Sequence, residues 1–189
     1  MFNNHQREKL VNAINFFVRE TKRCHTLKLF KLLNFLDFEH FRQTGAGVTG
    51  LTYKAWPNGP APSALWHELQ HGGHEDLQKS VAVFPVKDDL TNQLLRRDLK
   101  PRAAFDESYF TKRELKIMKM LAEVFHEIGA EDMSQFSHSR RLPWGKVFAQ
   151  GKGNGREIPY ELARSSEPIL PTLESLPEAE YEYRKAVFS

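Results

Sequence analysis

The stretch from residue 27 to residue 41 is the feature that most restricts what this chain can fold into. Its polar residues recur at every third position and form one narrow stripe, Lys28, Lys31, Asn34 and Asp37. Apolar residues occupy the rest of the circumference that a helix would have: Leu29, Phe30, Leu32, Leu33, Phe35, Leu36, Phe38 and Phe41. A helix that is apolar over most of its surface usually lies in the centre of a bundle. We therefore predict a central helix here, ended by the glycines that follow it.

Helical spacing of apolar residues also predicts the helices around this centre. One covers residues 5–20, and another covers residues 111–128. The second begins with a capping box, in which Thr111 precedes Glu114 by three residues and each satisfies a backbone donor of the other. We expect shorter helices over residues 62–71, 130–136 and 143–150.

Two stretches have the character of strands. Residues 48–56 alternate between two faces, and Pro57-Asn58-Gly59-Pro60 ends them because proline lacks the backbone donor of a ladder. Residues 80–86 are apolar and partly β-branched, and we predict that they pair with the first stretch. Residues 88–98 fit a short helix or a loop. The sequence thus predicts a mainly α fold, a compact helical domain of five to seven helices with a small two-stranded antiparallel β-hairpin.

Composition narrows the class of protein. A single cysteine, Cys24, excludes an intramolecular disulfide framework and a cysteine-cluster zinc site, and we expect it to be buried and inert. No stretch of 18 or more apolar residues is present, and the first residues lack the apolar core of a signal peptide. We therefore expect a reduced, soluble, cytoplasmic protein without a membrane partner.

The charge of the chain is small and unevenly distributed. The formal net charge is +3, but the first 60 residues carry nine basic and four acidic side chains, a net +5. Residues 151–189 carry five basic and seven acidic side chains, a net −2. A mixed surface of this kind suits a protein partner better than duplex DNA. We predict one domain over residues 1–164 and an acidic, proline-containing tail over residues 165–189.

One motif suggests a zinc hydrolase. His67-Glu68-Leu69-Gln70-His71 matches H-E-x-x-H, in which two imidazoles one helical turn apart bind zinc and the glutamate acts as general base. Two glycines follow at once, whereas a zinc-protease helix continues, and no convincing third ligand is present. An exposed helix end rich in histidine and glutamate is therefore the favoured interpretation. His67 and His71 remain weak metal candidates, and we predict neither a catalytic residue nor a cofactor.

A second alternative is a DNA-binding regulator. Residues 115–150 have a loose helix-turn-helix pattern, interrupted at Gly129. Arg140, Arg141 and Lys146 are the cations that would meet phosphates. A helical bundle with solvated arginines explains the same pattern, and it is the interpretation that we favour.

Several motifs, in one order, resemble a known family. Lys28-Leu29-Phe30-Lys31-Leu32-Leu33 opens the central helix, and an extended stretch through Tyr53 and Trp56 leads to Gly59-Pro60 and then to a helix bearing Leu65. Further on come Met133-Ser134-Gln135-Phe136-Ser137-His138, in which methionine replaces the usual leucine, then Trp144 and Ile158-Pro159-Tyr160. The order resembles the SocA-like antitoxin family with a Panacea domain, once known as a phage-associated domain of unknown function. The resemblance covers about residues 8–163.

The resemblance implies a protein without enzymatic activity that neutralises a toxin. Such antitoxins bind a cognate toxin protein directly, and some members deliver it to an ATP-dependent protease as adaptors. The helix after the Gly-Pro turn needs no zinc pair in this family, so His67 and His71 fall on variable positions. The residues that carry the family pattern are either scaffold or toxin interface: Tyr53, Trp56, Gly59, Pro60, Ser137, His138 and Trp144.

Overall fold

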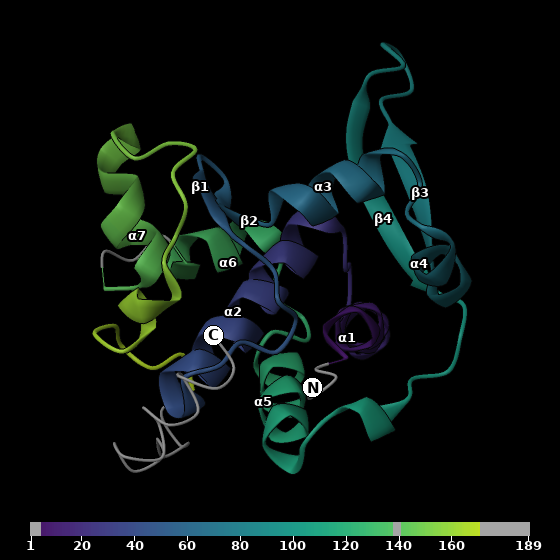
Figure 1. Cartoon of the computed structure of the whole chain (residues 1–189). Coiled ribbons are helices and arrows are strands. Elements are labelled where there is room, and N and C mark those ends of the chain that lie inside the picture. The colour runs from purple at the N-terminus through teal and green to yellow at the C-terminus, as the bar shows by residue number, and fades with distance from the viewer. Residues whose placement is uncertain (1–4, 138–140, 171–189) are drawn as a thin grey trace.

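A computed structural model describes residues 5–137 and 141–170 of the chain (Figure 1). Its helices are α1 (Gln6–Glu20), α2 (Thr26–Thr44), α3 (Ser63–Gln70), α4 (Glu75–Ser80), α5 (Lys112–Val124), α6 (Ala130–Ser137) and α7 (Pro143–Phe148). Its strands are β1 (Lys54–Trp56), β2 (Gly59–Ala61), β3 (Val81–Lys87) and β4 (Leu94–Pro101). Short 3-10 turns follow at η1 (Glu107–Tyr109), η2 (Ala149–Gly151) and η3 (Tyr160–Ala163). The mainly α prediction is confirmed.

Helix α2 is the centre of the molecule, as its composition predicts. It runs through the middle of Figure 1, and α1, α5, α6, β2 and η3 all pack against it. All but three of its 19 residues are buried, and the whole polar stripe is among the buried residues. Because no side of α2 faces solvent, the polar groups of the stripe must find partners inside the protein.

The predicted pairing of residues 48–56 with 80–86 is wrong. Each stretch instead forms a hairpin with the segment that follows it: β1 pairs with β2, and β3 pairs with β4. In the first hairpin Trp56 lies opposite Gly59, so Pro57 and Asn58 form a two-residue turn rather than a stop. The undecided residues 88–98 form the turn of the second hairpin and most of β4.

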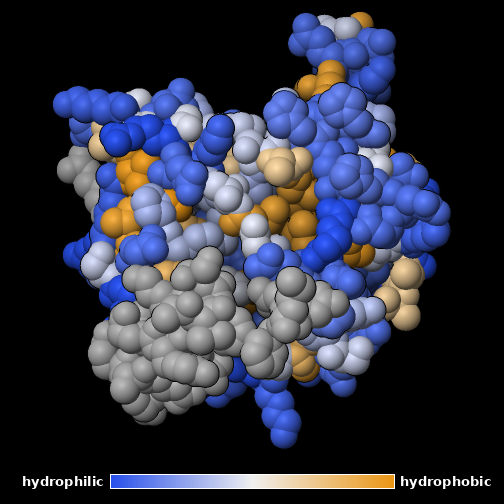
Figure 2. Space-filling model, viewed as in Figure 1, coloured by the Kyte–Doolittle hydropathy of each residue, from blue (hydrophilic) through white to orange (hydrophobic). Residues whose placement is uncertain are grey.

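The second hairpin projects from the helical body. Figure 1 shows β3 and β4 rising beyond α3 and α4, and in Figure 2 the same projection stands clear of the rest of the surface. Its base is buried through Val81 and Leu99, whereas most of the residues toward its turn are exposed. The hairpin is therefore anchored at one end and free at the other.

The remaining predictions hold with small shifts. The capping box between Thr111 and Glu114 is formed in both directions, but α5 ends at Val124, four residues before the predicted end. Helix α4 was not predicted. Cys24 is buried and free, and burial raises its pKa to about 11, as expected of an inert thiol. In the described part of the chain, no helix combines the length and the apolar character that a membrane crossing requires.

The chain remains packed beyond the predicted start of the tail. Leu170 is buried, and the backbone N–H of Ile169 donates to the Glu39 carboxylate at 3.1 Å. Residues 171–189, which make up most of the predicted tail, lie outside the described residues. The boundary at residue 164 therefore stays a prediction.

Candidate functional site

The polar stripe of α2 ends in a buried carboxylate, Asp37. It accepts hydrogen bonds from the backbone N–H groups of Val48 and Thr49, from the Thr49 hydroxyl at 2.5 Å and from the Tyr53 hydroxyl at 2.6 Å. Burial raises the pKa of Asp37, and these hydrogen bonds oppose that rise. The contacts fasten the extended segment that leads into β1 onto the central helix.

Lys31 lies two turns before Asp37 and holds the turn of the first hairpin. Its Nζ donates to the Asn58 carbonyl oxygen at 2.9 Å. The side chain is buried, and burial lowers its pKa to about 8. One turn further along α2, the Asn34 Nδ2 is buried without a hydrogen-bond partner. The stripe thus places a buried ammonium against the turn of the hairpin.

Lys28, the first member of the stripe, has a different role. Its Nζ donates to the carbonyl oxygens of Lys22 at 2.7 Å and His126 at 3.2 Å. Those carbonyls belong to the α1–α2 connection and to the end of α5. Lys28 therefore joins three elements at the far end of the central helix.

Two tryptophans from other elements, Trp144 on α7 and Trp66 on α3, contact Trp56 of the first hairpin. The Trp144 indole N–H on α7 donates to the Trp56 carbonyl oxygen at 3.0 Å. The Trp56 ring meets the Trp66 ring edge-on at 5.6 Å, while Trp144 stacks on Phe148 at 4.5 Å. We call Trp56, Asn58, Gly59, Pro60 and Trp144 the β1–β2 corner.

A third backbone segment completes the corner. The Ala55 N–H donates to the Arg156 carbonyl oxygen and the Ile158 N–H to the Tyr53 carbonyl oxygen, at 2.8 and 2.9 Å. The chain after η2 thus runs along the outer edge of β1. Gly59 has a φ of 117°, a conformation that only glycine adopts readily, which explains its place after the turn.

The structure thus brings five of the seven family-pattern residues together around the first hairpin: Tyr53, Trp56, Gly59, Pro60 and Trp144. Ser137 is the last residue of α6, but its side chain is not described, and His138 lies outside the described residues. Tyr53, Gly59, Pro60 and Trp144 are buried, and Trp56 is half-buried. The contacts of these residues fit a scaffold, and whether any of them also contacts a partner stays a prediction.

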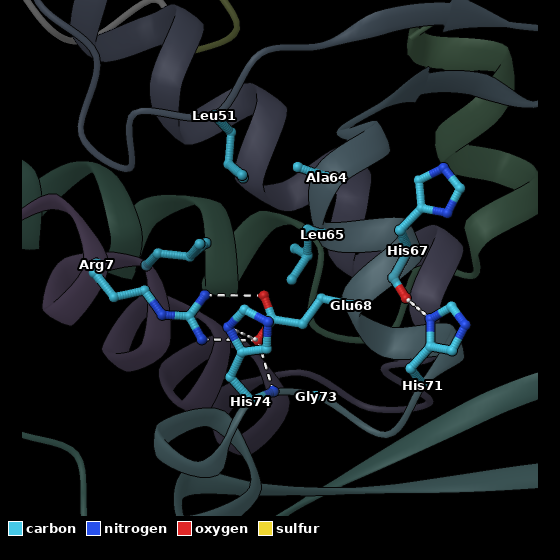
Figure 3. Close-up of a pocket in the computed structure, with 10 residues that line it drawn as sticks. Arg7, Leu51, Ala64, Leu65, His67, Glu68, His71, Gly73 and His74 are labelled. Atoms are coloured by element: carbon cyan, nitrogen blue, oxygen red, sulfur yellow. Dashed lines mark hydrogen bonds and ion pairs between the residues drawn. The ribbon is translucent and has the colours of Figure 1, made fainter.

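The H-E-x-x-H motif lies beside a cleft of about 500 Å³ (Figure 3). Its glutamate is committed elsewhere, because the Arg7 guanidinium donates to both Glu68 oxygens at 2.9 and 2.7 Å and the His74 N–H donates to the same carboxylate. Burial opposes ionisation of Glu68, but the hydrogen bonds from Arg7 and His74 outweigh it and lower the pKa. Glu68 is thus an ion-pair partner rather than a free base.

The two histidines of the motif make contacts of their own within and beside α3. Helix α3 ends at Gln70, and the ring of His71 uses Nδ1 to bond the His67 carbonyl oxygen at 2.8 Å. The His67 ring instead lies edge-on against Trp66 at 4.8 Å. Within residues 5–137 and 141–170, no group of three or more His, Cys, Asp or Glu side chains is placed to hold a metal ion. The arrangement supports the interpretation of an exposed helix end.

The cations of the DNA-binding alternative also have protein partners where they are described. Arg141 forms an ion pair with Glu167 at 2.8 Å, and the Lys146 Nζ donates to Ser165. Arg140 lies outside the described residues. Helix α6 carries Glu131 and Asp132 in its first turn, and carboxylates there repel the phosphates of a duplex.

Comparison with known proteins decides the family. The model of the family described as antitoxin SocA-like, Panacea domain, matches residues 29–145, more than half of the chain. The chain belongs to this family. No curated protein and no solved structure matches it.

The matched residues include most of the structural features described above. The family match runs from the first turn of α2 to the start of α7, and so contains Lys31, Asn34 and Asp37 of the buried stripe, the β1–β2 corner and the projecting hairpin. Sequence reasoning missed the roles of Lys31, Asn34 and Asp37, which it described only as a polar stripe. The signal was present, since a helix predicted to be central has no solvent side for a polar stripe.

Proposed function

We propose that this Panacea-domain protein is the antitoxin of a toxin–antitoxin pair and neutralises its toxin by direct protein–protein binding, without catalysing a reaction. The observation that carries the proposal is the match to the SocA-like antitoxin family over residues 29–145. The ion pair of Glu68 with Arg7 also argues against the general-base role that the hydrolase alternative requires, and Arg141 is paired with Glu167 at the surface.

In this proposal the buried stripe and the β1–β2 corner act as scaffold. Apart from the Asn34 amide, the polar side chains of the stripe make hydrogen bonds within the chain, such as Lys31 with Asn58, and in the corner Trp144 donates to Trp56. Groups with satisfied partners inside the protein have little capacity to bind another. Toxin recognition then belongs to exposed side chains that the scaffold holds in place.

Co-expression tests the proposal. The product of the neighbouring gene is induced in a bacterial host with and without this chain, and growth is measured. We expect the neighbouring product to stop growth alone, and this chain to restore growth and to co-purify with it. A harmless neighbouring product, or no rescue at equal expression, contradicts the proposal.

The fate of the toxin distinguishes simple blocking from delivery to a protease. We propose blocking as the primary mode, with an ATP-dependent protease as a further partner if the chain acts as an adaptor. Blocking leaves the toxin at a constant level in rescued cells, and rescue persists in a host without the protease. Delivery predicts that the toxin level falls, and that rescue is lost in the protease-deficient host.

A further inference from the structure

The projecting hairpin of β3 and β4 carries most of the large apolar side chains that are exposed in the described chain. Six large apolar side chains are exposed in residues 5–137 and 141–170, and four of them are Phe84, Leu90, Leu94 and Leu95. Leu90 at the turn is 96% exposed and Leu95 is 61% exposed. Exposed apolar residues that cluster on one element indicate a surface that another molecule covers.

The hairpin is held firmly enough to present these side chains. At its base the Leu99 N–H donates to the Cys24 carbonyl oxygen, and the Thr26 hydroxyl donates to the Arg97 carbonyl oxygen. At its turn the Asp88 carboxylate accepts from the N–H groups of Leu90 and Thr91 and from the Thr91 hydroxyl. A surface ordered before binding loses less conformational entropy when a partner docks.

The charges on the hairpin indicate the chemistry of that partner. Lys87 and Arg97 form no ion pair in the part of the chain that the structure describes, and Lys100 lies over the Phe84 ring at 5.5 Å. Within the described part of the chain, Arg96 is the one basic residue of the hairpin that forms an ion pair, with Asp98 at 2.8 Å, and the turn itself carries two acids, Asp88 and Asp89. Unpaired cations beside apolar side chains complement an apolar groove that is bordered by carboxylates.

We propose that the hairpin, residues 81–101, is the toxin-recognition arm. Its exposed leucines enter an apolar groove on the toxin, and carboxylates at the rim of that groove face Lys87 and Arg97 on the strands. This inference rests on the proposed antitoxin function. A second copy of the chain fits less well, because two such hairpins meeting at their tips bring like charges together. An anionic lipid surface also fits less well, since Asp88 and Asp89 directly precede Leu90 and a surface that is anionic throughout repels them, whereas carboxylates at a groove rim face only the strands.

Substitutions at the exposed turn test the arm without disturbing the core. The double variant Leu90→Asp and Leu95→Asp is compared with Val124→Asp, which changes a 51% exposed valine at the end of α5. Binding to the purified neighbouring-gene product is measured by biolayer interferometry, and circular dichroism checks that each variant is folded. We expect the double variant to weaken binding by about 30-fold or more, as loss of a central contact does. Val124→Asp should bind like wild type.

A charge variant tests the carboxylates of the groove. Lys87→Glu combined with Arg97→Glu places negative charges where the toxin is expected to be negative. We expect a loss of affinity of about 10-fold at 50 mM salt that shrinks at 500 mM salt, because salt screens the repulsion. An affinity that is unchanged at low salt overturns the charge assignment.

The outcomes separate this inference from the proposed function. If wild type neither binds nor rescues, the antitoxin function fails and the arm fails with it. If wild type binds and the Leu90/Leu95 variant binds equally well, the arm is overturned while the antitoxin function stands. Light scattering and sedimentation with anionic vesicles complete the test. Self-association or vesicle binding that the same variant abolishes, with toxin binding intact, overturns the arm in favour of a second copy or a lipid surface.

Discussion

Asp37 shows how single residues of the central helix determine the path of the chain that follows. We predict that Asp37→Ala destabilises the protein by about 3 kcal/mol, since it leaves buried donors of Thr49 and Tyr53 without an acceptor. Tyr53→Phe is the matched control, because it removes one hydrogen bond and keeps the carboxylate, and should cost about 1 to 2 kcal/mol. Urea unfolding measures both. Equal losses in the two variants would contradict the central role of the carboxylate.

Lys31 predicts a dependence of stability on pH. Its pKa is about 8 in the folded protein and 10.5 in an unperturbed side chain, so between these values the unfolded chain binds more protons. Stability attributable to Lys31 therefore rises as the pH increases from about 7 to 10, by up to about 3 kcal/mol.

The comparison that isolates this effect uses Lys31→Met. The difference in unfolding free energy between wild type and Lys31→Met is measured by urea denaturation at several pH values, which cancels the titration of other groups. The difference should shift toward wild type as the pH rises. A difference that does not change between pH 7 and pH 10 means that Lys31 is charged at its ordinary pKa.

Arg7 acts at the scale of elements, because it ties α1 to α3 and α4. Its guanidinium bonds Glu68 on α3 and Asp76 on α4, and the hydrogen bond from Arg7 lowers the pKa of Asp76 to about 2. The stability gained from an acid whose pKa is lowered is present above its ordinary pKa and is lost as the pH falls toward the lowered value. Arg7 and Asp76 are both partly exposed, so we expect the link to add only about 1 to 2 kcal/mol to the free energy of unfolding.

The variant Arg7→Leu tests this link. Its unfolding free energy should lie below that of wild type at pH 6, and the gap should narrow as the pH falls from 4.5 to 2. Lys79→Leu is the control, since among the described residues Lys79 pairs only with Glu75, one turn away on α4. A gap for Arg7→Leu no larger than that of the control would remove Arg7 as a link between the helices.

The elements themselves were predictable to different degrees. Helix α2 could be predicted because a helix that is apolar all round has one stable location. Leu51, Tyr53 and Ala55 share one face of the alternating residues 48–56, and all three are buried. Alternation reports the buried face but not the partner strand, and here Asp37 satisfies the donors of Val48 and Thr49 in place of a ladder. The long-range pairing was therefore predicted wrongly.

The candidate site could be predicted where the order of residues along the chain is informative, and could not be predicted where it depends on long-range contacts. The order of Tyr53, Trp56, Gly59, Pro60 and Trp144 along the chain indicated the family, and the structure places these residues around one hairpin. The commitment of Glu68 to Arg7, 61 positions away, is a tertiary contact that spacing within a five-residue motif does not reveal. A local motif is thus only as informative as the long-range contacts that its residues make.

At the scale of the whole molecule, the fold divides into a helical body and a projecting hairpin (Figures 1 and 2). This division predicts that the end of the hairpin can be removed without unfolding the body. Val86 lies opposite Arg96, so replacing residues 87–95 with Asn-Gly closes the hairpin by the turn that two-residue loops favour. The anchors of the base, at Leu99 and Arg97, are kept.

We expect this shortened protein to unfold within about 1 kcal/mol of wild type, because the removed side chains are almost all exposed and the buried core is untouched. Urea denaturation followed by circular dichroism measures the change. The same protein should fail to rescue growth against the toxin, since it lacks Leu90, Leu94 and Leu95. A loss of several kcal/mol would show that the turn supports the body. Full rescue by a stable shortened protein would place toxin recognition on the helical body instead.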